Sequence, residues 1–280
     1  NHDNPRFLST PGSTPERLEL ALVFLYTSRG IPSLYYGTEQ DFNGNGDPAN
    51  REDMFDGQFE QGPSVGDNFN MTSPRFRLVS KLNNLRRIYP ALRTGSHENL
   101  WADWDSPGIL AYARRLGGQE VYVVLNTATS PQTIGARPTI HPAGTVLVNA
   151  LNPAETLTVT SATDGIPSIL MPATSCKMFV AQSQWTALSP VVQAVSPAHD
   201  AAGISPAAPI MVTFSQPMDT ASVQAAFATN PATTGDFAWS EGNTVLSYTP
   251  TSLSPNTTYT VKIGGAAAAS DGRPIYAPFE

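Results

Sequence analysis

The sequence changes its pattern at Pro90, and this change constrains the fold more than any other feature. Before Pro90, apolar residues recur at the three- and four-residue spacing of amphipathic helices, on either side of one short apolar run. After Pro90, short runs of aliphatic, aromatic and β-branched residues alternate with Gly, Pro and Asn, which is typical of antiparallel strands joined by turns. The sequence therefore predicts a helix–strand–helix piece followed by all-β modules.

The first predicted helix covers residues 14–28. Ser13, with Glu16 three residues later, fits a capping box, and Thr14, which would place Pro15 at the first helical position, is the alternative N-cap. The apolar stripe of this helix consists of Leu18, Ala21, Leu22 and Leu25.

The rest of the segment before Pro90 holds one strand, one long loop and a second helix. Residues 31–36 form an apolar run between glycines, which predicts a parallel strand buried on both faces. The polar stretch 38–72 predicts a long functional loop. The second helix covers residues 73–89, and Pro90 ends it. Its buried face is expected to contain Phe76, Val79, Leu82, Leu85 and Arg86.

The remaining sequence predicts two β domains. Residues 91–183 form an antiparallel β-sandwich, residues 184–189 a linker, and residues 190–280 a second β-sandwich with at most a turn or two of helix at 221–228. The predicted strands are 110–115, 120–126, 144–149 and 156–160 in the first domain and 210–214, 245–248 and 258–263 in the second.

Composition excludes several classes of partner. The 280 residues carry a net charge of −7, whereas nucleic acids and anionic membranes require a basic surface, so neither is expected. No apolar run reaches the roughly 20 residues of a membrane span. Cys176 is the only cysteine, which rules out an intrachain disulfide and a thiolate metal cluster. We interpret it as a small apolar residue buried in a strand, with a reactive thiol as the alternative.

Three motifs near the start share one family resemblance. Residues 1–7 read Asn-His-Asp-Asn-Pro-Arg-Phe, residues 27–40 read Thr-Ser-Arg-Gly-Ile-Pro-Ser-Leu-Tyr-Tyr-Gly-Thr-Glu-Gln, and residues 44–51 read Gly-Asn-Gly-Asp-Pro-Ala-Asn-Arg. They resemble the ends of the seventh and eighth barrel strands of the α-amylase family (glycoside hydrolase family 13). The third motif resembles the subgroup with cyclodextrin glucanotransferases and maltogenic amylases. The resemblance implies that residues 1–90 are the C-terminal part of an incomplete (β/α)8 TIM barrel, that 91–183 are an amylase C domain, and that residue 1 is not a natural start.

The resemblance also implies roles for four residues. A retaining glycosidase uses two carboxylates about 5 Å apart, helped by hydrogen bonds to the sugar hydroxyls that strengthen in the transition state. In this family a third carboxylate makes those bonds, which implies that Asp3 is the transition-state stabiliser and that His2 donates to the same sugar ring. Asp47 and Arg51 would bind a donor-side glucose. The alternatives are a polar turn at residues 1–4 and a surface salt bridge between Asp47 and Arg51.

Residues 41–52 also satisfy the EF-hand pattern, which would make them a calcium loop. Pro48 at the eighth loop position and a predicted strand in place of the first flanking helix argue against this reading, so we expect no metal site and no cofactor in this chain. In the family the calcium sites lie mainly upstream, so the resemblance implies that calcium sites of the parent protein lie there. Glu39 is interpreted as a structural acceptor. Trp101 and Trp104 either contact starch or pack the β domain against the barrel.

Residues 190–280 resemble a different family, the bacterial Ig-like domains of the surface-layer type. The most specific part is Phe214-Ser-Gln-Pro-Met-Asp219, supported by residues 190–197, 253–261 and 271–274. The resemblance implies a spacer or a binding appendage that contacts a cell surface or a polysaccharide. The sequence stops where a last strand is expected, so we also expect this end to be truncated.

Together these features predict part of a secreted, extracellular α-amylase-type glycosidase that cleaves α-1,4-glucans by a retaining mechanism. The nucleophile and the acid/base are expected outside this chain, so the 280 residues alone should be inactive. A cyclodextrin glucanotransferase is the alternative activity, and a non-catalytic carbohydrate-binding or cell-surface protein is the alternative of another class.

Overall fold

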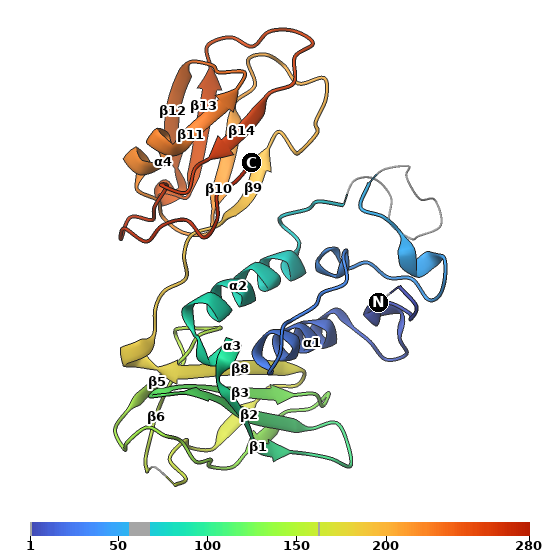
Figure 1. The fold of residues 1–280 in the computed structure, drawn as a ribbon, viewed down its shortest axis with the longest axis vertical. Helices are drawn as coiled ribbons and strands as arrows, with labels where there is room; N and C mark the ends of the chain where they lie inside the picture. The colour runs from blue at the N-terminus through green and yellow to red at the C-terminus, as the bar shows by residue number, and fades with distance from the viewer. Residues whose placement is uncertain (1, 56–67, 162) are drawn as a thin grey trace. The chain divides into compact units, whose positions relative to one another are not determined.

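The computed structural model describes residues 2–55, 68–161 and 163–280 (Figure 1). The chain divides into two compact units. Unit 1 takes in residues 1–68 and 73–187, and unit 2 takes in residues 69–72 and 188–280. Unit 1 thus combines the part of the chain before Pro90, here called the helical segment, with the first β domain. The expected boundary at residue 90 and the expected linker at 184–189 remain predictions.

Helix α1 covers Pro15–Thr27. Of the two expected N-caps, the structure has Thr14, whose side chain accepts a hydrogen bond of 3.3 Å from a backbone N–H of the first turn. Pro15 therefore stands at the first helical position, where its missing N–H costs nothing, and the capping box at Ser13 is wrong. Leu18 and Leu22 are buried as predicted, and the other two residues of the predicted stripe are half-buried.

Residues 31–36 do not form the predicted parallel strand. Ile31, the first residue of the run, is 94% exposed, which also contradicts burial on both faces. A parallel strand needs a neighbouring strand for its backbone hydrogen bonds, and every strand pair among the described residues is antiparallel. Residues 31–36 are apolar, but among the described residues they have no partner strand for backbone hydrogen bonds.

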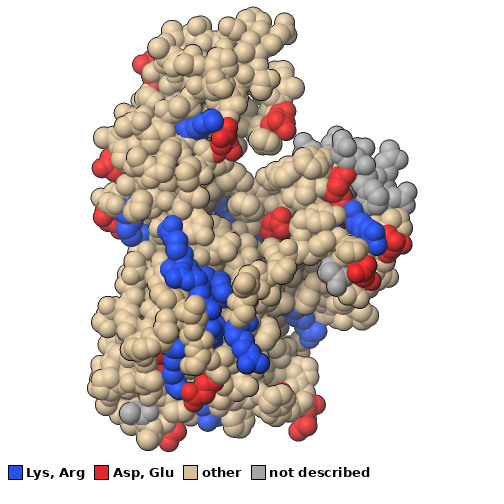
Figure 2. Space-filling view, in the orientation of Figure 1, with Lys and Arg blue, Asp and Glu red and all other residues tan. Residues whose placement is uncertain are grey.

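Helix α2 covers Pro74–Ile88, close to the predicted bounds, and the short helix α3 covers Ala91–Thr94. Leu82 and Leu85 are buried as predicted. Six of the 16 Lys and Arg residues lie at 74–94, a range without Asp or Glu, and Figure 2 shows Lys and Arg side chains gathered over this part of unit 1. None of the helices within the described ranges has the length and apolar character needed to cross a membrane.

Among the described residues, eight strands make up the β domain of unit 1. Six form one antiparallel sheet in the order β1-β2-β3-β8-β5-β6, and β4 pairs with β7. Side chains of both sheets, among them Val124, Met171 and Phe179, meet in one core. The strands predicted in this domain are confirmed as β2, β3, β5 and β6. The bounds are β1 Ser96–Ala102, β2 Ile109–Leu116, β3 Gln119–Asn126, β4 Gln132–Ile134, β5 Val146–Asn149, β6 Thr156–Thr158, β7 Ile169–Met171 and β8 Ser175–Ala181.

The helical segment is joined to the β domain by buried polar contacts. Figure 1 shows α1, α2 and α3 on one side of the six-stranded sheet. Thr27 Oγ1, in the last turn of α1, lies 2.6 Å from the hydroxyl of Tyr112 on β2. Arg114, also on β2, is 1% exposed. Its guanidinium donates to five backbone carbonyl oxygens, those of Thr27, Ser28, Leu92, Gly95 and Ser96.

Unit 2 is a small β-sandwich. One sheet has the strand order β12-β13-β10-β9, and β11 pairs with β14. Val212, Phe214 and Leu246 are central in its core. The predicted strands are confirmed as β10, β13 and β14, and the expected turn of helix is α4. The bounds are β9 Val192–Ser196, β10 Ile210–Phe214, α4 Thr220–Ala226, β11 Phe227–Asn230, β12 Gly235–Ser240, β13 Val245–Pro250 and β14 Thr260–Ile263.

Cys176 lies in β8, as predicted, although it is half-buried rather than fully buried. Burial raises the pKa of its thiol to about 12, and the nearby Glu19 carboxylate adds to the shift. The thiolate is the reactive form of cysteine, so this shift disfavours the alternative of a reactive thiol.

Candidate active site

Two loops of unit 1 bring the four predicted site residues together. Arg51 Nη2 lies 3.9 Å from Asp3 Oδ1, and Arg51 Nε lies 3.1 Å from Asp47 Oδ1. His2 Nε2 lies 3.1 Å from the same Asp3 oxygen. Residues from two distant parts of the sequence therefore form one polar cluster. The catalytic and sugar-binding roles of these residues remain a proposal.

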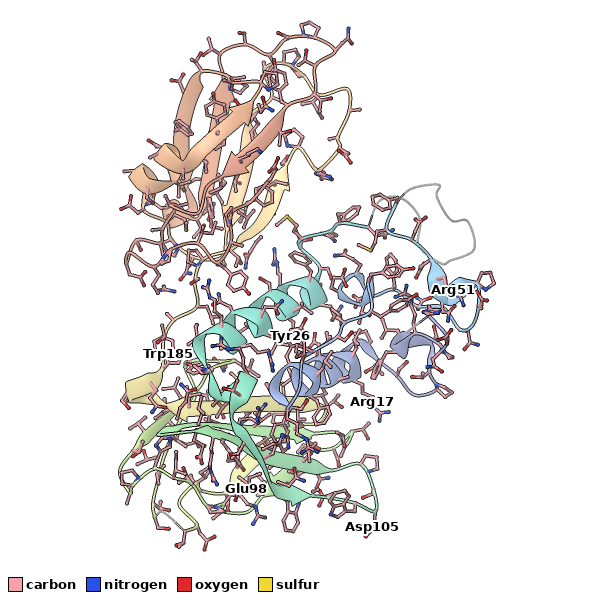
Figure 3. All side chains as sticks on the ribbon, in the orientation of Figure 1. Arg17, Tyr26, Arg51, Glu98, Asp105 and Trp185 are labelled. Carbon is pink, nitrogen blue, oxygen red and sulfur yellow. The ribbon has the colours of Figure 1, made fainter. Side chains whose placement is uncertain are left out.

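The cluster is open to solvent. The exposed fractions of the side chains are 57% for His2, 67% for Asp3, 62% for Asp47 and 42% for Arg51. Ion pairs at this exposure contribute little to stability, so the cluster does not hold the fold together. In Figure 3, Arg51 lies among the loops of unit 1, away from Glu98 and Asp105 of the β domain. Carboxylate acceptors beside a guanidinium donor are suited to adjacent hydroxyl groups of a sugar.

The loop that carries Asp47 and Arg51 is tightly turned. The 3-10 turn η3 covers Ala49–Arg51, and the backbone N–H of Asn50 donates to Gly46 O at 3.0 Å. At Gly44, φ is 155° and a Cβ atom would lie 2.1 Å from Ala49 O. Only glycine fits this position, because any side chain would collide with the backbone of the turn.

Arg6 connects the first loop to the second. It is 5% exposed, and its Nη1 donates to Tyr36 O at 2.7 Å. Its guanidinium carbon lies 4.4 Å, 5.0 Å and 5.1 Å from the ring centres of Tyr35, Tyr36 and Phe42, a buried cation–π arrangement. Its backbone N–H donates to Gly44 O at 2.9 Å. The sequence alone gave Arg6 no role beyond its place in the first motif. The available signal for a buried arginine was the pair of aromatic residues Tyr35 and Tyr36.

Tyr36 adds a further contact between the loops. Its hydroxyl donates to Arg51 O at 3.1 Å. Partial burial raises the pKa of the Tyr36 phenol above its usual value, and a hydrogen bond with Tyr35 raises it further. The phenol therefore stays protonated, and able to donate to Arg51 O, at neutral and mildly alkaline pH.

The first residue of the EF-hand pattern takes part in an ion pair. Asp41, the first position of that pattern, uses both carboxylate oxygens to accept hydrogen bonds from Arg75 Nε and Nη2, each at 2.7 Å. Within the described parts of the chain, no group of three or more His, Cys, Asp or Glu side chains is placed to hold a metal. Glu39 accepts from Gly37 N at 3.3 Å, in agreement with the structural role expected of it.

The two tryptophans near β1 do not both pack against the helical segment. Trp104 is 85% exposed, so the packing alternative is wrong for this residue. Trp101 is 44% exposed, and the guanidinium carbon of Arg137 lies 4.5 Å from the centre of its ring. Its indole N–H donates to Asp103 Oδ1 at 2.9 Å. Contact of these rings with starch remains a prediction.

Parts of the chain are similar to two kinds of known protein. Residues 187–279 match the bacterial Ig-like domain. A cyclomaltodextrin glucanotransferase of Bacillus licheniformis is 40% identical over 156 residues, which are 54% of this chain and 20% of that protein. An α-amylase of Niallia circulans is 36% identical over 156 residues, 54% of this chain and 26% of that protein. The chain thus spans about a fifth to a quarter of the length of these relatives.

Solved structures agree with the sequence relatives. An Anoxybacillus α-amylase is 27% identical, with a TM-score of 0.52, over 65% of this chain and 36% of that chain. A cyclomaltodextrin glucanotransferase with a three-domain ABC distribution is 28% identical, with a TM-score of 0.54, over 64% of this chain and 35% of that chain. The chain is therefore similar to α-amylases and cyclomaltodextrin glucanotransferases over about half of its length, and to the bacterial Ig-like domain over residues 187–279.

Proposed function

We propose that unit 1 supplies part of the substrate site of a secreted α-amylase-type glycosidase that cleaves α-1,4-glucosidic bonds by a retaining mechanism. Residues 1–90 would be the C-terminal part of its (β/α)8 barrel. The nucleophile and the acid/base would come from a part of the enzyme outside this chain. Any calcium would also bind there.

The observation that carries the proposal is the convergence of His2, Asp3, Asp47 and Arg51 on one exposed face. Asp3 would accept hydrogen bonds from the hydroxyls of the sugar at the cleavage point, and these bonds would strengthen as positive charge develops on the ring. Asp47 and Arg51, paired at 3.1 Å, would bind a neighbouring glucose by accepting from and donating to its hydroxyls.

Transglycosylation to cyclic or linear glucans is a second candidate. The motif Gly44-Asn-Gly-Asp-Pro-Ala-Asn-Arg51 favours it, and so does the number of cyclomaltodextrin glucanotransferases among the relatives. The Ig-like domain would act as a spacer or contact a polysaccharide or cell surface. An extracellular location would follow from the polymeric substrate.

The test compares the full-length enzyme that contains this chain with its Asp3→Asn variant on starch. Asn keeps the shape of Asp but removes the charge, so we expect kcat to fall by about 10²-fold or more. The matched control is Asp105→Asn, an exposed carboxylate that Figure 3 places away from Arg51. Chromatography of the products then separates the candidate activities.

Each outcome selects one function. Linear maltooligosaccharides that depend on Asp3 support the hydrolase, and cyclic products support the glucanotransferase. Absence of any product from the wild-type enzyme leaves a carbohydrate-binding or cell-surface role. The 280 residues alone should release no sugar, and starch hydrolysis by them would contradict the proposal that the nucleophile lies elsewhere.

A further inference from the structure

We propose that Asn50 is a positioning residue that fixes the backbone on both sides of Asp3; this inference rests on the role proposed for Asp3. Asn50 Nδ2 donates two hydrogen bonds of 2.9 Å, one to His2 O and one to Asn4 O. Asn50 is 1% exposed, so these bonds are shielded from competing water. One amide group therefore binds the carbonyl oxygens of the residues on either side of Asp3.

Asn50 is itself fixed within the second loop. Its backbone N–H donates to Gly46 O at 3.0 Å, and its carbonyl oxygen accepts from Arg6 Nε at 3.0 Å. Arg51 follows Asn50 directly, and Arg51 Nε lies 3.3 Å from His2 O, the oxygen that Asn50 also binds. The side chain of Asn50 thus sets where Asp3 lies with respect to Asp47 and Arg51.

The chemistry of this position requires an amide. Both partners are carbonyl oxygens, so the group that faces them must carry two N–H donors, which assigns the NH2 end of Asn50 to this side. Asp has no donor when ionised, and Ser has only one. Among the described atoms, Asn50 Oδ1 is buried and has no hydrogen-bond partner. A buried, unpaired acceptor costs stability, so the function of this amide lies in what its NH2 group holds.

Positioning matters because Asp3 acts by hydrogen bonding to a substrate. A misplacement of about 1 Å in a catalytic group can cost roughly 10²-fold in rate. In the absence of the Asn50 amide, His2 O and Asn4 O would lose these two bonds, and His2 O would keep its longer contact with Arg51 Nε. Asp3 would then reach its transition-state geometry in a smaller fraction of the bound complexes.

The test is a double-mutant cycle in the full-length enzyme with Asn50→Ala and Asp3→Asn. If Asn50 acts through Asp3, Asn50→Ala lowers kcat by about 10²-fold in the wild-type background and by less than about threefold in the Asp3→Asn background. KM should change by less than about threefold, because the glucan still binds through Asp47 and Arg51. Asn50→Ser, which keeps one donor, should fall between wild type and Asn50→Ala.

The controls keep the test falsifiable. Asn43→Asp changes an exposed amide nearby and should leave kcat unchanged. Circular dichroism and the melting temperature identify any variant that fails to fold, and Asn50→Ser then replaces Asn50→Ala in the cycle. An equal loss of kcat in both backgrounds would overturn the positioning role. Unchanged activity of Asp3→Asn alone would instead overturn the proposed function.

Discussion

Arg51, in the candidate site, and Arg114, at the joint between α1 and the β domain, belong to the same compact unit but lie in opposite surroundings. Arg51 is 42% exposed and faces two carboxylates, those of Asp47 and Asp3. Arg114 is 1% exposed, and its guanidinium donates to five backbone carbonyl oxygens. A guanidinium whose three nitrogens all donate to the backbone is structural, whereas one left open to solvent can bind a ligand.

Electrostatics reinforces the contrast. Burial lowers the pKa of Arg114, and the neighbouring guanidinium of Arg86 lowers it further. Arg86 donates to Tyr26 O and Gly30 O, so both arginines lie at the C-terminal end of α1. The carbonyl groups at this end carry partial negative charge, which takes the place of a counter-ion for the two guanidinium groups.

The largest effect on stability is expected from Arg114→Ala. Its removal leaves several buried carbonyl oxygens unpaired, so the free energy of unfolding should fall by about 3 kcal/mol. Denaturant unfolding of the chain, followed by circular dichroism, measures it. Arg29→Ala, at an exposed arginine nearby, is the control and should change stability by less than about 0.5 kcal/mol. Equal effects of the two variants would break the comparison.

An intermediate effect is expected from Thr27→Val. The substitution keeps the shape of the side chain but removes the partner of the Tyr112 hydroxyl, so stability should fall by about 1–2 kcal/mol. Adding Tyr112→Phe removes the second partner as well, and the double variant should recover part of the loss. The same denaturant titration tests both. A double variant less stable than the sum of the single effects would argue against a direct bond.

The smallest effect on stability is expected from Arg51→Ala. Because its ion pairs are exposed, the free energy of unfolding should change by less than about 0.5 kcal/mol. In the full-length enzyme, KM for short maltooligosaccharides should nevertheless rise about tenfold, since charge-assisted hydrogen bonds to the substrate are lost. Steady-state kinetics measures the second quantity. An unchanged KM would support the alternative, in which Arg51 only forms a surface salt bridge with Asp47.

Local patterns predicted much of the fold. The 3.6-residue periodicity located α1 and α2, and alternating apolar residues located β2, β3 and β13. The strand at residues 31–36 was wrong because strand formation depends on a partner that lies elsewhere in the fold, which composition does not encode. The choice between Ser13 and Thr14 as N-cap likewise depended on backbone angles that residue types leave open.

The candidate site was predictable only in part. Its four polar residues were found because they lie in recognisable motifs. Asn50 and Arg6 act through backbone atoms far away in the sequence, and no local pattern marks a side chain whose partners are main-chain oxygens. The same reason hid Arg114, which would have been assigned to the surface from its charge alone.

The hydrogen bonds of Arg114 also determine whether the chain can be divided into independent folding units. Its carbonyl partners come from both sides of residue 90, with Thr27 and Ser28 before it and Leu92, Gly95 and Ser96 after it. A cut at residue 90 would leave the buried Arg114 guanidinium with three of its five carbonyl acceptors, so the two pieces would not be independent folding units. The helical segment and the β domain should instead melt in a single cooperative transition, and a limited protease should find no early cleavage site between them.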